Sequence, residues 1–174
     1  MTKSSPFLIL AAFLALAPLT AHAERADREQ PINIEADKVT VDDRNRTHTF
    51  DGNVVLTQGT LELRGAKIVV VQGADGFQTG VATAAEGELA TFRQKREGVE
   101  EYVEGEAERI EYDGRNETAT LFRRAQVRAG GDVVRGDVIE YDALTENYTA
   151  HRLPAEGSGD SRIRVTIQPK TSGS

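Results

Sequence analysis

The chain has 174 residues, no cysteine and a formal net charge of −7. Without cysteine it can form no disulfide framework, so packing and hydrogen bonding must hold the fold. The acidic balance argues against a nucleic-acid partner, because nucleic-acid phosphates call for a basic surface.

The first 23 residues have the pattern of a secretory signal peptide. Lys3 supplies a positive charge, residues 7–17 are wholly apolar, and Ala21-His22-Ala23 has the small-x-small form of a cleavage site. The apolar run is shorter than the roughly 20 residues that a spanning helix needs, although a retained signal anchor is the competing interpretation. We expect the mature chain to begin near Glu24.

Beyond the leader, the dominant pattern is an alternation of apolar and polar residues. Alternate side chains of a strand point to opposite faces, so each such segment predicts one apolar face and one wet face. The clearest segments are residues 32–34, 39–41, 61–63, 110–112 and 163–167. Turn-forming pairs such as Asp51-Gly52 and Asp113-Gly114 separate the segments, and no helical apolar stripe follows residue 24. The pattern predicts an all-β fold: a sandwich, a barrel, a jelly roll or a β-solenoid.

The chain also contains an internal repeat. Residues 36–71 align with residues 107–142 without gaps and with ten identities, and a weaker third copy begins at Asp137. Each unit has the order strand, polar turn, strand, glycine turn, strand. The repeat predicts strand–turn units that stack on their neighbours.

A charged segment, residues 87–105, lies between the two copies. We expect it to form a long hairpin with a solvated tip, and an acidic binding patch is the alternative. After Leu153 the chain is rich in Pro, Gly and Ser except for residues 163–167, and residues 169–174 are expected to be disordered.

Several short motifs occur in a characteristic order. They are PINIEADKV at 31–39, TFDGNVVLTQG at 49–59, LRGAKIVV at 63–70, ATF at 90–92 and VEGEA at 103–107. Over residues 30–152 the chain resembles the periplasmic lipopolysaccharide-transport protein A family, with its OstA-like domain.

This resemblance implies a slightly open, antiparallel β-jelly roll with an apolar inside, located in the periplasm of a Gram-negative bacterium. The expected organisation is a signal peptide (1–23), a flexible N-terminus (24–30), the jelly roll (31–153), and a C-terminal strand with a disordered tail (154–174). The implied partners are lipopolysaccharide, bound through lipid A, an inner-membrane-anchored jelly-roll protein and an outer-membrane translocon. No cofactor is expected, and no phosphate-binding loop suggests an energy source in this chain.

Head-to-tail self-association is also implied, because a jelly roll that does not close leaves edge strands able to accept another strand. We expect residues 32–39 to pair with strands within 137–152 or 162–167 of the next molecule.

A carrier of acyl chains must offer an apolar lining, since each CH₂ left in water costs about 0.8 kcal/mol. Phe92 and Tyr112 are the best individual candidates for acyl contact, and Leu61 and Val70 should share the inner side. In any small β-domain these residues would also be core, so simple packing is the alternative. The residues expected to bind lipid are Ile32, Ile34, Val39, Val41, Phe50, Val54, Leu56, Leu63, Ile68, Phe92, Ile110, Tyr112, Leu121, Val127, Val134, Ile139 and Tyr141.

Other functions find less support. The chain after residue 23 holds only two histidines, His48 and His151, and no G-x-S-x-G motif, so we expect neither a nucleophilic enzyme nor a zinc site. We expect this protein not to be an enzyme; a glycosidase or lyase with a pair of carboxylates is the alternative, because the sequence does not show the distance between carboxylates. Arg64 and Arg135 are expected in solvated or cross-strand positions rather than on lipid phosphates. A structural β-repeat module, such as an adhesin segment, is the main alternative and predicts a sealed interior without a ligand.

Overall fold

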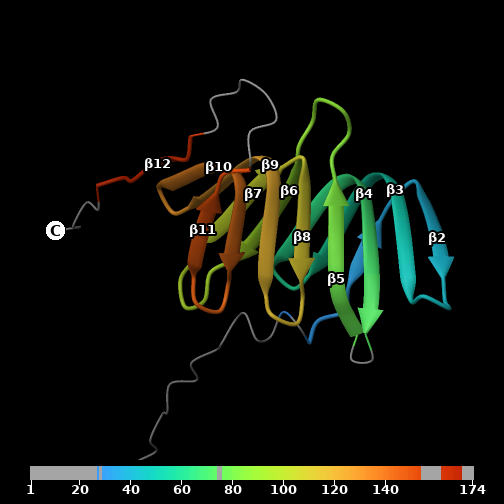
Figure 1. Cartoon of the computed structure of the whole chain (residues 1–174). Coiled ribbons are helices and arrows are strands. Elements are labelled where there is room, and N and C mark those ends of the chain that lie inside the picture. Colours follow the sequence, from blue (N-terminus) through green and yellow to red (C-terminus); the bar gives the residue numbers. More distant parts are fainter. Residues whose placement is uncertain (1–26, 28, 74–75, 154–161, 170–174) are drawn as a thin grey trace, which may run out of the picture.

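The computed structural model describes residues 27, 29–73, 76–153 and 162–169, and this part of the chain is an all-β structure (Figure 1). Its strands all pair antiparallel. Their bounds are β1 (Asn33–Glu35), β2 (Lys38–Asp42), β3 (Thr47–Gln58), β4 (Leu61–Gly73), β5 (Gly76–Thr83), β6 (Ala90–Lys95), β7 (Tyr102–Ala107), β8 (Arg109–Asp113), β9 (Thr118–Ala129), β10 (Asp132–Asp142), β11 (Asn147–His151) and β12 (Arg164–Thr166). Among the described residues, no helix has the length and apolar character needed to cross a membrane.

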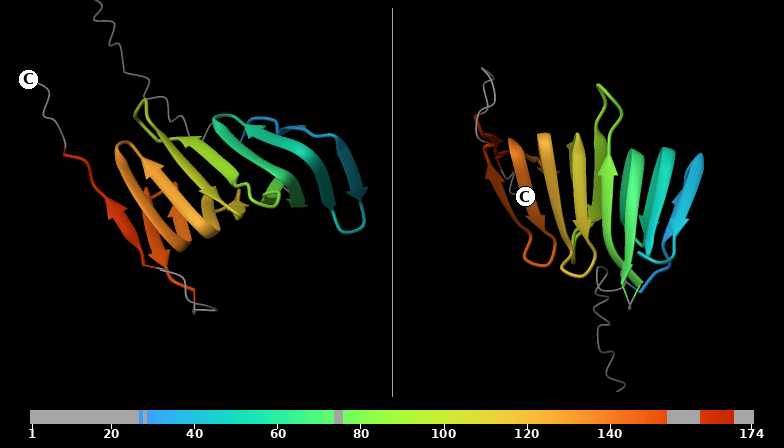
Figure 2. Two further views of the ribbon diagram at one scale, coloured as in Figure 1. Left: turned by 90° about the horizontal axis from the view of Figure 1, so that it is seen from above. Right: turned by 45° about the vertical axis from the view of Figure 1, so that its right-hand side comes forward.

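Each of the four long strands, β3, β4, β9 and β10, belongs with one half to a first sheet and with its other half to a second sheet. The first sheet has the order β2-β3-β4-β5-β8-β9-β10-β11. The second sheet has the order β1-β3-β4-β6-β7-β9-β10-β12. Figure 2 shows the two layers running side by side along the molecule, with β1 and β2 at one end and β11 and β12 at the other.

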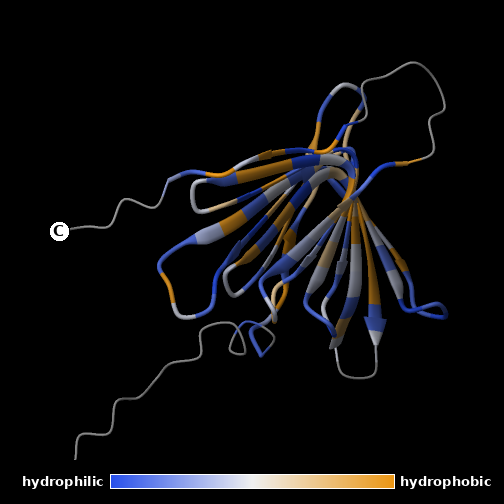
Figure 3. Cartoon of the chain, turned by 60° about the vertical axis from the view of Figure 1, so that its left-hand side comes forward, coloured by the Kyte–Doolittle hydropathy of each residue, from blue (hydrophilic) through white to orange (hydrophobic). Residues whose placement is uncertain are grey.

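The long strands bend where they pass from one sheet to the other. In β3, Gly52 and Asn53 have positive φ angles of 83° and 48°, and the pairing with β4 shifts register between Asp51 and Val54. In β9, Arg123 and Arg124 have φ angles of 61° and 52°. Two consecutive left-handed residues form a bulge that redirects the strand. The sheets therefore meet along these bends and diverge toward the hairpin turns, as a wedge (Figure 3).

We call the side of the wedge that carries the hairpin turns the open edge. It comprises residues 43–46, 114–117 and 143–146 of the first sheet and residues 59–60, 96–101 and 130–131 of the second.

The internal repeat is confirmed by the structure, because β2–β3–β4 and β8–β9–β10 have matching bounds and pairings. Their polar turns are the same Asx turn. The Asp42 carboxylate accepts the backbone N–H of Asn45 at 3.1 Å, and the Asp113 carboxylate accepts that of Asn116 at 3.2 Å. In the third copy, Asp142 accepts the N–H of Thr145 at 3.0 Å.

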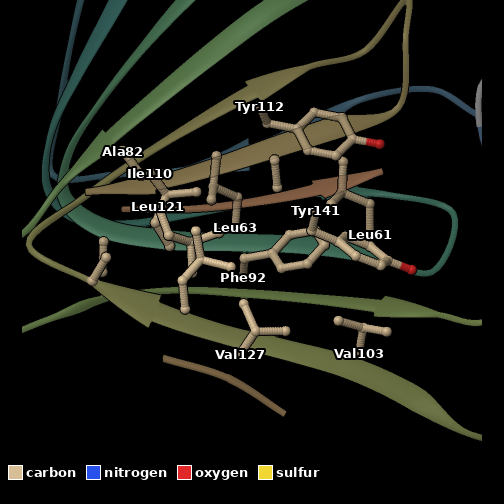
Figure 4. Close-up of a cluster of buried hydrophobic side chains, with 14 of the residues drawn as sticks. Leu61, Leu63, Ala82, Phe92, Val103, Ile110, Tyr112, Leu121, Val127 and Tyr141 are labelled. Carbon is tan, nitrogen blue, oxygen red and sulfur yellow. The ribbon is translucent and has the colours of Figure 1, made fainter. Parts of the chain in front are cut away.

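Apolar side chains from both sheets fill the middle of the wedge (Figure 4). Phe92 of the second sheet contacts Tyr112 and Tyr141 of the first, with ring centroids 6.1 Å and 6.0 Å apart. Gly105 permits this closeness, since a Cβ there would lie 2.7 Å from a methyl carbon of Leu121. The middle of the interior is therefore closed by the chain's own side chains.

The charged segment between the repeats forms the predicted hairpin, made by β6 and β7 with its turn at 96–101. The predicted strand at 163–167 is β12. The predicted signal peptide and most of the predicted tail lie outside the described residues.

Candidate functional site

The inner face of the first sheet carries two rows of opposed residues, and each row crosses all eight strands. Directly opposed residues of an antiparallel pair project from the same face, so the pairing registers define each row. The first row is Val39, Phe50, Ile68, Ala82, Ile110, Leu121, Ile139 and Ala150. The second row is Val41, His48, Val70, Gly80, Tyr112, Ala119, Tyr141 and Tyr148.

A third row crosses the inner face of the second sheet. It consists of Ile34, Leu56, Leu63, Phe92, Gly105, Val127, Val134 and Val165. The three rows form an almost wholly apolar lining from the β1–β2 end of the wedge to the β11–β12 end.

Exposure along these rows rises from the middle toward both ends. Ile68 and Leu121 in the middle are 0% exposed, whereas Val39 and Val41 are 54% and 51% exposed. At the other end Val165 is 56% exposed and Tyr148 is 37% exposed. The lining is thus packed in the middle and open to solvent at both ends.

A cavity of about 800 Å³ lies between the two sheets at the β11–β12 end, and we call it the C-terminal cavity. Its lining is Arg96, Val99, Glu101, Val103, Ala129, Gly130, Gly131, Asp132, Tyr141, Glu146, Tyr148, Ile167, Gln168 and Pro169. Val103 and Tyr141 are almost fully buried, and Figure 4 places both beside the packed interior. The cavity therefore extends the apolar lining toward solvent.

Charged residues stand at the outer margin of this cavity. The guanidinium of Arg96 lies 2.6 Å from Glu146 and 2.7 Å from Glu101. Its hydrogen bond to Glu146, followed by the charges of both carboxylates, raises the pKa of Arg96 above its ordinary value. The cavity thus combines apolar side chains such as Val103 and Tyr148 with charged ones, and such a mixed lining suits an amphiphile. In the described residues no group of three His, Asp or Glu side chains is placed to hold a metal ion.

The predicted lipid-binding residues all lie on or beside the inner face, but their surroundings differ. All but Val39 and Val41 belong to the buried core or pack against it. Phe92 and Tyr112, the preferred acyl contacts, are only 1% and 4% exposed, in the packed middle.

Tyr148, Val165 and Ile167 were not among the predicted binding residues, although all three are exposed apolar side chains at the β11–β12 end. The third repeat copy and the alternation at 163–167 were the available indications. Arg64 pairs with Glu62 of its own strand at 2.7 Å.

Comparison with known proteins identifies the family. Residues 33–147 match the family model described as LptA/(LptD N-terminal domain) LPS transport protein. The chain belongs to this family.

Two curated relatives are lipopolysaccharide export system proteins named LptA. That of Haemophilus influenzae is 32% identical over 162 residues, which are 93% of this chain and 91% of the relative. That of Escherichia coli K12 is 34% identical over 139 residues, or 80% and 74% of the two chains. These proteins are named for export, not for a reaction.

The Pseudomonas aeruginosa relative LptH, also named as a lipopolysaccharide export protein, is 31% identical over 165 residues, covering 94% of this chain and 93% of LptH. The crystal structure of LptH, described as the LptA-homologous periplasmic component of a lipopolysaccharide transport device, superposes with a TM-score of 0.75 and 28% identity. The match covers 83% of this chain and 99% of that structure. The expected family and the open all-β jelly roll are thereby confirmed.

Proposed function

We propose that this protein is a periplasmic carrier that holds the acyl chains of lipopolysaccharide between its two sheets and passes the lipid toward the outer membrane. The observation that carries the proposal is the apolar lining, which crosses every strand and is exposed at both ends. The export role named for LptA and LptH supports it.

The physical reason is the cost of hydrating acyl chains. At about 0.8 kcal/mol for each CH₂, several long chains cannot cross water unshielded. Soluble proteins rarely leave a large apolar patch exposed without a partner. Val39 and Val41 at one end, and Tyr148 and Val165 at the other, are exposed apolar side chains that a lipid or a second molecule would cover.

The proposal includes head-to-tail assembly, because each end of the wedge has edges that accept a strand. In the described residues β1 and β2 pair only with β3, and β11 and β12 pair only with β10. If β11 of one molecule pairs antiparallel with β2 of the next, a single register places Tyr148 opposite Val41 and Ala150 opposite Val39. Both rows of the first sheet then continue into the next molecule.

The second sheet can continue in the same way. Pairing β12 with β1 so that Val165 opposes Ile34 also brings Arg164 opposite Glu35 and Ile167 opposite Ile32. Unlike charges and apolar pairs across strands are the favourable combinations. The inner-membrane jelly-roll partner and the outer-membrane translocon would offer similar edges, which makes the protein a bridge.

Photocrosslinking with matched positions tests the carrier role. A photoreactive residue at Val41 or Tyr148 faces the lining, whereas one at the adjacent Thr40 or Thr149 faces the outside. We expect lipopolysaccharide adducts at Val41 and Tyr148 and few at Thr40 and Thr149. Equal adducts on both faces, or none at all, would contradict the proposal.

Disulfide formation tests the assembly, since the chain has no cysteine of its own. In a Thr40→Cys, Thr149→Cys variant, β2 of one molecule should crosslink to β11 of the next and give a ladder of oligomers. Thr40→Cys combined with Glu111→Cys on central strand β8 is the control and should give none. A chain that binds lipopolysaccharide but forms no ladder keeps the carrier role and excludes the bridge.

The structural β-repeat module is the less favoured function. It requires a sealed interior with covered ends, whereas both ends of this lining are about half exposed. The carrier proposal also assigns residues 31–153 to the carrier domain and residues 1–23 to an export signal that is removed.

A further inference from the structure

Arg96 and Glu146 join the two sheets across the open edge. Arg96 follows β6 of the second sheet, and Glu146 lies in the turn between β10 and β11 of the first. The guanidinium binds the carboxylate through two nitrogens, Nη2 to Oε2 at 2.6 Å and Nε to Oε1 at 3.2 Å. By contrast, the ion pair of Arg93 and Glu104 joins neighbouring strands within one sheet.

Both partners are held in place by their own sheets. The backbone N–H of Arg96 donates to the carbonyl of Glu101 at 2.9 Å, and its Nη1 donates to the Glu101 carboxylate at 2.7 Å. Glu146 has a positive φ of 53° in a turn that Asp142 stabilises by accepting the N–H of Thr145. The side chains of Arg96 and Glu146 are only 27% and 35% exposed. A two-point, partly shielded pair between fixed elements is stronger than an ordinary surface ion pair.

The pair also lies over the C-terminal cavity, whose lining includes both residues together with Val103, Tyr141 and Tyr148. A lipid whose chains lie between the sheets must keep its sugars and phosphates at the open edge, because the apolar interior cannot solvate them. A headgroup moving along the open edge toward the β11–β12 end therefore meets this ion pair.

We propose that the Arg96–Glu146 pair is a gate across the open edge, which the anionic headgroup of the cargo opens by competing with Glu146 for the guanidinium. The inference rests on the proposed carrier function. Arginine binds phosphate and carboxylate through the same pair of N–H donors. A lipid phosphate can therefore replace the Glu146 carboxylate without a new orientation of the guanidinium. Glu101 keeps Arg96 on the hairpin while Glu146 is released.

A reversible tether tests the gate. In an Arg96→Cys, Glu146→Cys variant, a short bifunctional methanethiosulfonate holds the two sheets together. With a photoreactive residue at Tyr148, we expect the tether to lower lipopolysaccharide adducts by at least roughly fivefold. The covalent link holds the sheets together at least as firmly as the modest ion pair that it replaces. Reduction of the tether should restore them, and adducts at Val41 should not change. The control tether, Arg93→Cys with Glu104→Cys, lies within one sheet and should have no effect.

Two charge variants test the gate without a tether. Glu146→Gln removes the pair but leaves the Arg96–Glu101 contact, and adducts at Tyr148 should form severalfold faster. The exchange Arg96→Glu with Glu146→Arg, combined with Glu101→Gln so that two carboxylates do not face each other, restores an ion pair across the open edge and should return the rate toward that of the wild type. Unchanged adducts under the tether, or a wild-type rate for Glu146→Gln, would overturn the gate while the carrier role stands. If no adducts form at Val41 or Tyr148 in the untethered protein, the carrier role itself is wrong.

Discussion

Gly52 in β3 and Arg123 in β9 occupy the same place in the two copies of the repeat, and both have a positive φ, 83° and 61°. Each carbonyl accepts an equivalent hydrogen bond, from the N–H of Asp37 at 3.0 Å and from that of Glu108 at 3.1 Å. The same bend is therefore made once by glycine, which adopts this conformation freely, and once by arginine, which does not.

The first prediction concerns this strained bend. Replacing Arg123 with Gly and Arg124 with Asn copies Gly52-Asn53 into the second bend. We expect the free energy of unfolding to rise by about 1 kcal/mol, because relief of backbone strain outweighs the added freedom of the unfolded chain. Chemical denaturation measures this. The reverse change, Asn53→Arg, should destabilise, and a loss of stability in the Arg123, Arg124 variant would show that the bend is not strained.

The second prediction compares two glycines. A Cβ at Gly105 would lie 2.7 Å from Leu121 and 3.3 Å from Phe92, in the middle of the interior. A Cβ at Gly136 would meet nothing closer than 3.6 Å. We expect Gly105→Ala to cost about 1–3 kcal/mol through overpacking and Gly136→Ala to be tolerated, as measured by thermal or urea unfolding. Equal effects would mean that the middle of the wedge is not tightly closed.

The third prediction concerns low pH. Partial burial raises the pKa of Asp113, but hydrogen bonds from the backbone of Arg115 and Asn116 and from the Asn116 side chain outweigh this, so that its pKa lies below 3.8. A carboxyl whose pKa is lowered by folding stabilises the protein above its unfolded pKa, and this contribution is lost as pH falls through the folded pKa.

Asp113→Asn should therefore be less stable than the wild type near neutral pH, and the difference should shrink between about pH 5 and about pH 2. Urea unfolding across this range is the measurement. A difference that does not depend on pH would assign the loss to the turn geometry alone.

The fourth prediction concerns the exposed end of the lining. Val41→Asp should weaken lipopolysaccharide binding by roughly tenfold or more, because it replaces an apolar contact with a charge. Val41 is 51% exposed, so the free energy of unfolding should change by less than about 0.5 kcal/mol. Thr40→Asp, on the outer face of the same strand, is the control. If both variants bind equally well, the end of the lining does not contact lipid.

The positions of most strands and turns along the chain were predictable from the local sequence pattern. The alternation at 39–41 and 110–112 marks β2 and β8, and the repeat marks the equivalent Asx turns at Asp42 and Asp113. The bends were not predicted, because Arg123-Arg124 has none of the preference for positive φ that Gly52-Asn53 has. At the site, the inward-facing residues were predictable, but the Arg96–Glu146 pair was not.

The inward-facing positions, the turns that join the strands and the family of the chain all follow from the amino-acid sequence. Alternation along a strand and residue preferences in turns are local properties, so a single chain displays them directly. Only the folded chain shows that Phe92 and Tyr112 close the middle while Val41 and Tyr148 stay exposed, and that Arg96 reaches Glu146. These outcomes depend on how two sheets converge at their bends, which is set by contacts between residues far apart in the sequence.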